Sequence, residues 1–390
     1  MKRLLAFLFC LAGAGLACAQ APRAPEVAAK SYLVIDLTSD KVLAEREADT
    51  PADPASLTKL MTAYLVFGAL RDKKLALDQP LPVSMRAWAE RKGGGSLMFI
   101  DTTMTPTVDE LLHGMIVQSG NDAAVALAEG VGGTLDLFVP MMNRQAAAFG
   151  LKNTSFKNVT GLTEAGHRST ARDIAAIAAH IIRDFPDFYR YYSIREYKYN
   201  NISQPNRNLL LRRDPTVDGM KTGFTEAAGY CLVASSVREF PNLGPGGAAP
   251  GQRRLLSVVL NTTSMDARAG ESQKLLNWGF AAFDTVRLFD DAQPMVTAEV
   301  WKGKSKTAKL GVAGGLFVTI PKGEGAKLQT RVERAEPLLA PLAKGQRVGT
   351  VKVSTALGQA VVDVPLVALE AVEPAGLFGR AWDSLRLWIR

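Results

Sequence analysis

Apolar and polar residues alternate in short runs near both ends of a helix-rich stretch. Residues 32–36 and 42–45 flank a polar turn and predict a β-hairpin. Residues 229–237 and 253–262 predict two adjacent strands, separated by a Pro/Gly-rich loop over residues 241–251. Strands at both ends with helices between them predict an α/β (α+β) domain over residues 20–287, in which one sheet is built from both ends.

Apolar residues at helical spacing fill the interior of this domain. A capping-box signal at residues 107–110 opens a helix that is interrupted at residues 119–121, and a second helix follows at once. Three further helices are predicted, over residues 54–64, 171–182 and 272–283. The interruption at 119–121 therefore forms a corner between two helices, where polar side chains can face a cleft.

From about residue 292 the chain changes to short strand-like segments that are broken by Gly, Pro and Lys. This pattern predicts a small all-β sandwich domain over residues 292–372. The change places a domain boundary between residues 287 and 292.

The last stretch, residues 374–390, returns to helical spacing. Its apolar set is Leu377, Phe378, Ala381, Trp382, Leu385, Trp388 and Ile389. Two Trp and one Phe on one face, with three Arg among the polar residues, suit a bilayer interface. A helix docked on its own domain is the alternative. The segment is terminal and follows a break at Pro374, so a membrane surface is the expected partner.

The N-terminus predicts export. Two basic residues precede a short apolar run, and Ala17-Cys18-Ala19 has the small-x-small pattern of a signal-peptidase site. We expect residues 1–19 to be a signal peptide that is removed. A lipoprotein would use Cys18, but Gly15 stands where an aliphatic residue is expected.

Composition disfavours several classes of partner. Without residues 1–19 the net charge falls from +8 to +6, and Cys231 remains as the only cysteine, so no intrachain disulfide can form. In its apolar run Cys231 is expected to be a small buried residue rather than a nucleophile. No zinc-finger spacing and no basic run interleaved with aromatics occurs, so nucleic acid is not an expected partner. Few histidines and cysteines disfavour a metal-dependent peptidase, and we expect no metal and no cofactor.

A serine and a lysine in the first predicted helix indicate nucleophilic catalysis. Ser56 and Lys59 are one helical turn apart and share a helix face. A lysine can activate a serine when its pKa is lowered, because only the neutral amine accepts a proton. Apolar neighbours and the helix N-terminus after Pro54 both act in this direction. The signal is weak alone, since about one S-x-x-K is expected by chance in a chain of this length.

Two further motifs strengthen this interpretation. Ser119-Gly120-Asn121 occupies the corner between two helices, where Ser119 would relay a proton to a leaving amine and Asn121 would hold a substrate amide. Lys221-Thr222-Gly223 precedes the strand over 229–237. A basic residue with a hydroxyl suits a carboxylate, and Gly223 would let a substrate backbone approach closely. Each motif alone is an ordinary turn or strand entry, but the three in this order form a strong joint signal.

A histidine-based hydrolase is less well supported. The chain has three histidines, His113, His167 and His180, and none lies in a G-x-S-x-G context. His113 and His180 lie in predicted helices and are expected to be structural.

At S-x-x-K, S-x-N and K-T-G the sequence resembles the serine D-alanyl-D-alanine carboxypeptidases, the low-molecular-mass penicillin-binding proteins. Residues 204–208, 217–235 and 267–280 also resemble family segments, as does the order of signal peptide, catalytic domain, β domain and amphipathic helix. The resemblance implies a penicillin-binding/β-lactamase-like fold. It implies removal of the terminal D-Ala from peptidoglycan stem pentapeptides, and acylation by β-lactams. It further implies a periplasmic protein, attached to the outer face of the cytoplasmic membrane through residues 374–390.

The resemblance also implies a role for each matching residue. Ser56 would be the acylated nucleophile and Lys59 its general base. Ser119 and Asn121 would complete the proton network and bind the peptide. The implied ligands of the substrate carboxylate are Lys221 and Thr222, next to Gly223, with Arg207 and Arg268 at longer range.

The implied oxyanion hole consists of the backbone N–H groups of Ser56 and Phe224. Phe224 departs from the family, whose members often carry His at this position. A backbone donor is retained by any residue, but a side-chain role of the histidine is not. The rate of hydrolysis of the acyl-enzyme is therefore left open by the sequence.

Two other functions share the fold. A β-lactamase is disfavoured because the second motif is S-G-N and no E-x-x-L-N element occurs between residues 121 and 221, where Glu164 is a poor match. A non-catalytic cell-wall scaffold has no physical need for the intact residues of all three motifs. The carboxypeptidase is the expected function.

Overall fold

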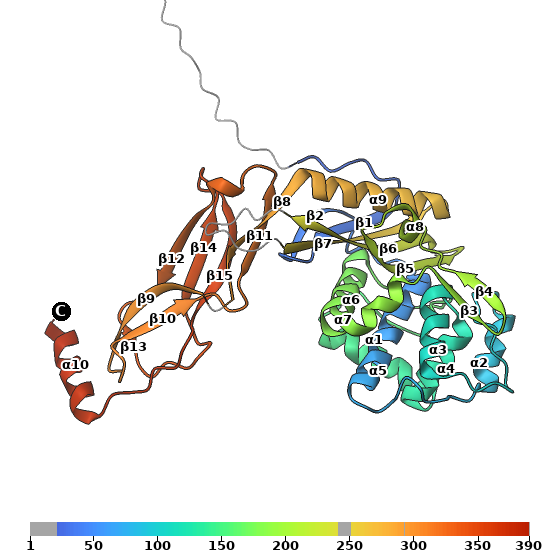
Figure 1. Ribbon diagram of the computed structural model, residues 1–390, viewed down its shortest axis with the longest axis horizontal. Coiled ribbons are helices and arrows are strands. Elements are labelled where there is room, and N and C mark those ends of the chain that lie inside the picture. The colour runs from blue at the N-terminus through green and yellow to red at the C-terminus, as the bar shows by residue number, and fades with distance from the viewer. Residues whose placement is uncertain (1–21, 241–250, 292, 390) are drawn as a thin grey trace, which may run out of the picture.

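The computed structural model of the chain describes residues 22–240, 251–291 and 293–389. The predicted signal peptide, residues 1–19, lies outside the described residues and stays a prediction. The predicted loop over 241–251 also lies outside them, apart from its last residue. In Figure 1 an α/β domain and an elongated β domain lie end to end, and the C-terminal helix lies at the far end of the β domain.

The first domain is built on a five-stranded sheet in the order β2-β1-β7-β6-β5. The strands are β1 (Ser31–Asp36), β2 (Lys41–Arg46), β5 (Val217–Thr225), β6 (Gly229–Phe240) and β7 (Gly251–Thr262). All neighbours are antiparallel, and β1 pairs with β7 so that Val34 lies opposite Ser257. This confirms the predicted hairpin, the adjacent strands and the sheet built from both ends. Because β5 is an edge strand, one of its edges is not paired within the sheet.

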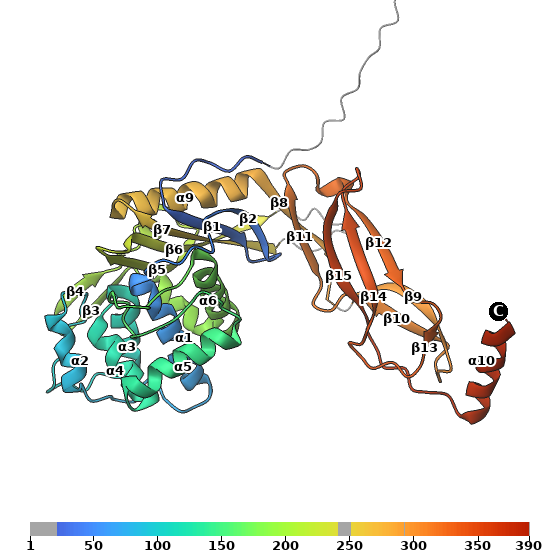
Figure 2. The same cartoon turned by 180° about the vertical axis from the view of Figure 1, so that it is seen from behind.

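Helices cover both faces of this sheet, as Figure 2 shows from behind. One face is covered by α9 (Met265–Ala282) and the short α8 (Leu210–Arg213). The helices that lie toward the other face are α1 (Lys59–Arg71), α2 (Met85–Ala89), α3 (Val108–His113), α4 (Asn121–Gly132), α5 (Leu135–Ala148), α6 (Ala171–Asp184) and α7 (Pro186–Tyr189). A small hairpin, β3 (Glu196–Tyr199) and β4 (Ile202–Pro205), lies beside them.

The corner between two helices forms where it was predicted. Thr107 and Glu110 make the reciprocal capping box that opens α3. After α3 the chain makes one π-helical turn, Gly114–Gln118, and α4 begins at Asn121. Ser119 ends the turn with φ of 71°, in the left-handed region. The change of direction at Ser119 separates α3 from α4 and turns both polar side chains of the motif toward the cleft.

The second domain is a β-sandwich, as predicted. Its strands are β8 (Phe283–Phe289), β9 (Pro294–Trp301), β10 (Thr307–Gly311), β11 (Leu316–Pro321), β12 (Gln329–Arg334), β13 (Leu338–Leu339), β14 (Arg347–Ser354) and β15 (Ala360–Ala368). A six-stranded sheet in the order β12-β14-β15-β10-β9-β13 packs on the pair β11-β8. Val286 and Ile320 of the pair share one core with Val351 and Leu366 of the larger sheet.

The sandwich begins earlier than the expected boundary. Residues 283–287 were expected in the first domain, but they belong to β8, which pairs with β11. Val286 and Leu288 are buried in the core of the β domain. The strand follows α9 without a loop, so no composition change marks the transition. The domain boundary therefore lies at Phe283.

A buried polar cluster joins the two domains. The carboxylate of Asp36, at the end of β1, is fully buried and accepts a hydrogen bond from Arg253 of β7 at 2.8 Å. It also accepts hydrogen bonds from Thr285 of β8 at 2.6 Å and from Thr319 of β11 at 2.7 Å. A buried carboxylate is tolerated when it is paired and hydrogen-bonded in this way.

The C-terminal helix α10 (Leu377–Ile389) docks on the β domain through a polar side chain. Asp383 is 2% exposed, and its carboxylate accepts hydrogen bonds from the backbone N–H of Lys302 at 2.7 Å and from Lys306 Nζ at 3.0 Å. By contrast, Phe378 and Trp388 are 94% and 84% exposed. The helix is therefore docked through Asp383 while its apolar face is uncovered, and the expected attachment to a membrane stays a prediction.

Among the described residues, no single helix has the length and hydropathy of a bilayer span. The neighbouring helices α4 and α5 reach that threshold only together, and they are bent by 85° at the break between them.

Candidate active site

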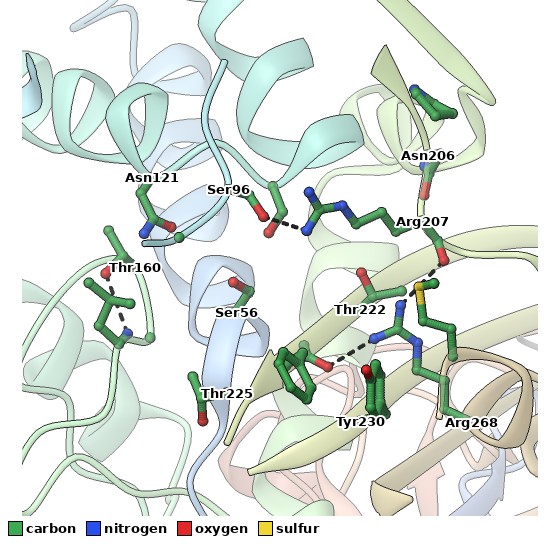
Figure 3. Close-up of a pocket in the computed structure, with 18 of the residues that line it drawn as sticks. Ser56, Ser96, Asn121, Thr160, Asn206, Arg207, Thr222, Thr225, Tyr230 and Arg268 are labelled. Carbon is green, nitrogen blue, oxygen red and sulfur yellow. Dashed lines mark hydrogen bonds between the residues drawn. The ribbon is translucent and has the colours of Figure 1, made fainter. Parts of the chain in front are cut away.

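A cavity of about 620 Å³ opens beside β5, where the sheet meets the helices. In Figure 3, Ser56 lies in its middle, with Asn121 and Thr160 on one side and Thr222 and Arg268 on the other. Of the predicted site residues, eight line it: Ser56, Ser119, Asn121, Arg207, Thr222, Gly223, Phe224 and Arg268. The other two, Lys59 and Lys221, are buried behind this lining. The structure thus brings all ten predicted residues together.

Ser56 is presented by a tight turn at the start of α1. The turn is the 3₁₀ helix Ala55–Thr58, and α1 begins directly after it with Lys59. Ala55 has φ of 47°, a left-handed conformation that costs about 1–2 kcal/mol for a residue with a Cβ. Despite the tighter turn, Lys59 Nζ lies 3.0 Å from Ser56 Oγ. The spacing that predicted a shared helix face therefore yields a direct contact.

The amine of Lys59 is held by two further acceptors. Nζ donates to Asn121 Oδ1 and to the backbone carbonyl of Thr160, both at 2.7 Å. A neutral amine has two N–H bonds for these two oxygens, which leaves its lone pair directed at Ser56 Oγ. This arrangement is compatible with the predicted role of Lys59 as a proton acceptor for the serine.

Burial lowers the pKa of Lys59 to about 7, against an ordinary value near 10.5. The side chain is 1% exposed, so the charged form loses its hydration. The carboxylates of Glu90 and Asp122 act in the opposite direction, and the guanidinium of Arg207 adds to the lowering. A pKa near neutrality gives a substantial population of the free amine at physiological pH.

A second buried lysine lies next to Ser119. Lys221 Nζ donates to Ser119 Oγ at 2.8 Å and to the backbone carbonyl of Thr222 at 3.1 Å. Burial and the nearby charge of Lys59 hold the pKa of Lys221 well below its usual value. The assignment of Lys221 to the substrate carboxylate stays a prediction, because its amine contacts Ser119 here. This contact connects the second motif to the third.

Two arginines form a positive end of the cavity. Arg268 Nη1 donates to the carbonyl of Gly223 at 3.0 Å, which fixes its guanidinium beside β5. Arg207 donates to Ser96 Oγ from the facing loop (Figure 3). Neither arginine forms an ion pair with a carboxylate among the residues that the structure describes. Burial lowers the pKa of Arg268 to about 10, and the group remains cationic at neutral pH. Together with the Thr222 hydroxyl, these cations can bind an anionic group.

Gly223 packs closely against the turn that carries Ser56, and its expected role toward a substrate backbone stays a prediction. An ideal Cβ at this position would lie 3.2 Å from Ala55 Cβ and 3.2 Å from the Pro54 carbonyl oxygen. The missing side chain therefore makes room for the turn that carries Ser56, rather than only for a substrate. This close packing brings the backbone of β5 next to the nucleophile.

Phe224 lines the mouth of the cavity and is 49% exposed. Its ring packs on Tyr230 with 4.3 Å between the ring centroids. The side chain therefore adds an apolar wall where a histidine would supply a titratable group.

Sequence reasoning missed two elements of the site. The first is Thr160, whose carbonyl oxygen accepts a hydrogen bond from Lys59. The second is the loop that carries Ser96. Asp122 holds this loop, since its carboxylate accepts from the backbone N–H groups of residues 98, 99 and 100. The Gly run at residues 93–95 was the available signal for an unusual loop, whereas a backbone carbonyl leaves no mark in the sequence.

The remaining candidates lie outside the cavity. His113 stacks on Tyr197, and His180 stacks on Phe149, which agrees with structural roles. Cys231 is fully buried, which confirms the expectation of a small buried residue, and burial raises the pKa of its thiol to about 11.

Comparison with known proteins supports the same interpretation. Residues 18–264 match the family described as D-alanyl-D-alanine carboxypeptidase, peptidase family S11. Residues 283–374 match the penicillin-binding protein 5 C-terminal domain. The latter match begins at the first residue of β8, where the structure places the domain boundary.

Similar proteins cover nearly the whole chain. The D-alanyl-D-alanine carboxypeptidase DacC of Escherichia coli (strain K12) is 43% identical over 387 residues, which are 98% of this chain and 94% of that protein. DacA of the same strain is 41% identical over 371 residues, covering 94% and 89%. Penicillin binding protein 5 from Haemophilus influenzae has a crystal structure with a TM-score of 0.83 and 39% identity, covering 90% of this chain and 99% of that one. The chain therefore belongs to the D-alanyl-D-alanine carboxypeptidase family of serine peptidases.

Proposed function

We propose that this serine-type D-alanyl-D-alanine carboxypeptidase forms its acyl-enzyme on Ser56, with Lys59 as general base. The observation that carries the proposal is the placement of Lys59 Nζ, 3.0 Å from Ser56 Oγ and held by two other oxygen acceptors. Burial keeps the amine partly neutral, so it can take the hydroxyl proton.

The reaction proceeds through two steps at this site. Ser56 Oγ attacks the carbonyl carbon of the penultimate D-Ala, and the hydroxyl proton moves to Lys59. The C–N bond to the terminal D-Ala then breaks, and Lys59 releases the proton it took, which Ser119 relays to the leaving nitrogen. Water subsequently attacks the ester carbonyl carbon, Lys59 accepts a proton from that water, and the proton passes to Ser56 Oγ as the ester C–O bond breaks. The net reaction shortens a peptidoglycan stem pentapeptide by one D-Ala.

The free edge of β5 orients the peptide. A substrate that lies along this edge can form backbone hydrogen bonds with it, as in β-strand addition. The terminal carboxylate then reaches Thr222, Arg207 and Arg268 at the positive end. The backbone N–H groups of Ser56 and Phe224 supply the oxyanion hole, where removing one such donor typically raises a barrier by about 3–4 kcal/mol.

β-Lactams use the same groups, since they present a carbonyl next to a carboxylate. They acylate Ser56 when the ring amide opens. A class A β-lactamase uses a glutamate as the general base for rapid deacylation, and of the described residues none that lines the cavity carries a carboxylate. Glu164, the one acid considered for this role, accepts a hydrogen bond from Asn158 instead.

The direct test is D-Ala release. We expect the purified protein to remove one residue from a peptide ending in Lys-D-Ala-D-Ala, measured as free D-Ala and as the shortened peptide by mass spectrometry. A peptide ending in Lys-D-Ala-L-Ala is the matched control and should stay intact. Labelling by a fluorescent penicillin without any D-Ala release would contradict the carboxypeptidase assignment.

We further propose that the mature protein is periplasmic and attached to the outer face of the cytoplasmic membrane through α10. Asp383 ties the polar side of this helix to the β domain, which leaves the Phe and Trp side chains uncovered. An amphipathic helix with exposed aromatics and with Arg380 and Arg386 among its polar residues suits an anionic bilayer surface.

Deleting residues 374–390 is expected to move the protein from the membrane pellet to the soluble fraction. Penicillin labelling should stay unchanged, because α10 lies at the far end of the molecule from the cavity (Figure 1). The double variant Phe378→Ser, Trp388→Ser should act in the same direction, since it removes the two most exposed aromatic groups of the helix and retains the Asp383 contact. Retention of the deletion variant in the pellet would contradict the proposal.

A further inference from the structure

One buried histidine is not used by the proposed reaction. His167 is 3% exposed and lies at the end of the loop that follows α5. Its Nδ1 accepts a hydrogen bond from the backbone N–H of Lys157 at 3.0 Å. A ring nitrogen that accepts carries no proton, so the proton of the neutral ring is on Nε2. Burial lowers the pKa of His167 to about 4, which keeps the ring neutral.

The protonated nitrogen of His167 reaches the turn that carries the nucleophile. Nε2 lies 2.8 Å from Thr58 Oγ1 and donates to it. Thr58 is the residue between Leu57 and Lys59, in the same turn as Ser56. His167 is therefore hydrogen-bonded at one nitrogen to the active-site turn and at the other nitrogen to a loop.

That loop is the one that supplies the Thr160 carbonyl to Lys59. Asn158 shapes it, because its Oδ1 accepts from the backbone N–H groups of Thr160 at 3.2 Å and of Gly161 at 2.7 Å. Gly161 then packs directly on the active-site turn: with φ of 88°, an ideal Cβ there would lie 1.8 Å from the Ala55 carbonyl oxygen. The loop and the turn are thus in contact at two points, Gly161 on Ala55 and His167 on Thr58.

We propose that His167 is a positioning residue for the general base. By joining the loop to Thr58, it sets the distance between the Thr160 carbonyl and Ser56 Oγ, two oxygens that are both within hydrogen-bond distance of Lys59 Nζ. The inference rests on the proposed role of Lys59. Displacements of about 1 Å in such an arrangement can reduce a rate by about 100-fold.

The hydrogen bond between His167 and Thr58 can be tested by a double-mutant cycle on acylation by a fluorescent penicillin. His167→Ala and Thr58→Val each remove this bond from one side. We expect each to slow acylation by about 10- to 100-fold, and the double variant to be no slower than the slower single variant. Additive losses would mean that the two residues act independently and would overturn the proposal.

The pH profile separates positioning from simple destabilisation. Loss of the hydrogen bond between His167 and Thr58 should loosen the loop and admit water to Lys59. Because burial is the main cause of the lowered pKa of Lys59, the midpoint of the pH profile of acylation should rise from about 7. The charges that act on Lys59, those of Glu90, Asp122, Arg207 and Lys221, are unchanged in these variants. His113→Ala is the control: it removes a histidine packed on Tyr197, outside the cavity, and should lower Tm without moving the midpoint.

Conservative replacements make the outcome decisive. His167→Gln retains an N–H donor near the position of Nε2 and should restore most of the acylation rate, whereas His167→Leu should not. If His167→Ala does not fold, Thr58→Val and His167→Gln still test the same bond. A Thr58→Val variant with wild-type rate and midpoint would overturn the proposal. Wild-type acylation that is independent of Lys59 would instead contradict the proposed function itself.

Discussion

Replacing Lys59 with alanine is expected to slow acylation of Ser56 by about 10²- to 10⁴-fold, the range that general bases contribute. The amine is the only base in contact with Ser56 Oγ among the described residues, and its two other hydrogen bonds direct its lone pair at the hydroxyl. The measurement is the rate of covalent labelling by a fluorescent penicillin under single-turnover conditions. Lys73→Ala, an exposed lysine after the end of α1, is the matched control and should label at the wild-type rate.

The wild-type acylation rate should rise with pH, as expected when the general base must be deprotonated. Lys59 must be neutral to accept a proton, and its pKa is about 7. Below that value the amine is increasingly protonated, so the rate should fall about tenfold per pH unit, and above it the rate should level off. A profile that is flat from pH 6 to pH 9, together with a fast Lys59→Ala variant, would place the general base elsewhere.

The Ser56→Ala variant is expected to lose both covalent penicillin labelling and D-Ala release. Removing a catalytic nucleophile can cost on the order of 10⁶ in kcat, so both signals should fall below detection. Ser119 is not in the position of Ser56, because its hydroxyl contacts Lys221 rather than Lys59. Gel fluorescence after penicillin treatment and a D-Ala assay measure the two losses on one sample.

A control for this variant is Cys231→Ala. The thiol is buried in the sheet and its pKa is raised, so the control should retain full labelling. Labelling that persists in Ser56→Ala would show that another residue is acylated. If the penicillin-labelled wild-type protein loses its label slowly, the apolar Phe224 is the first residue to change, by Phe224→His.

Local features of this protein were predictable because they depend on neighbours in the chain. The hairpin of β1 and β2, the capping box of α3 and the corner at Ser119 all follow from residues within one or two turns. The pairing of Ser56 with Lys59 belongs to the same class, since i and i+3 side chains meet on any helical turn. The order of the three motifs predicted that three segments distant in the sequence share one site. That prediction rested on the resemblance to a known family and not on geometry.

Only the tertiary structure decided the contacts between segments that are far apart in the sequence. Lys221 meets Ser119, and the carbonyl of Thr160 meets Lys59, only because the five-stranded sheet and the loop before α6 bring them together. A backbone carbonyl has no residue type, so no pattern could have marked it. The low pKa of Lys59 likewise depends on burial by the whole domain. The sequence therefore determined which groups are available for the proposed chemistry, and packing determined how they are oriented and how burial shifts their pKa values.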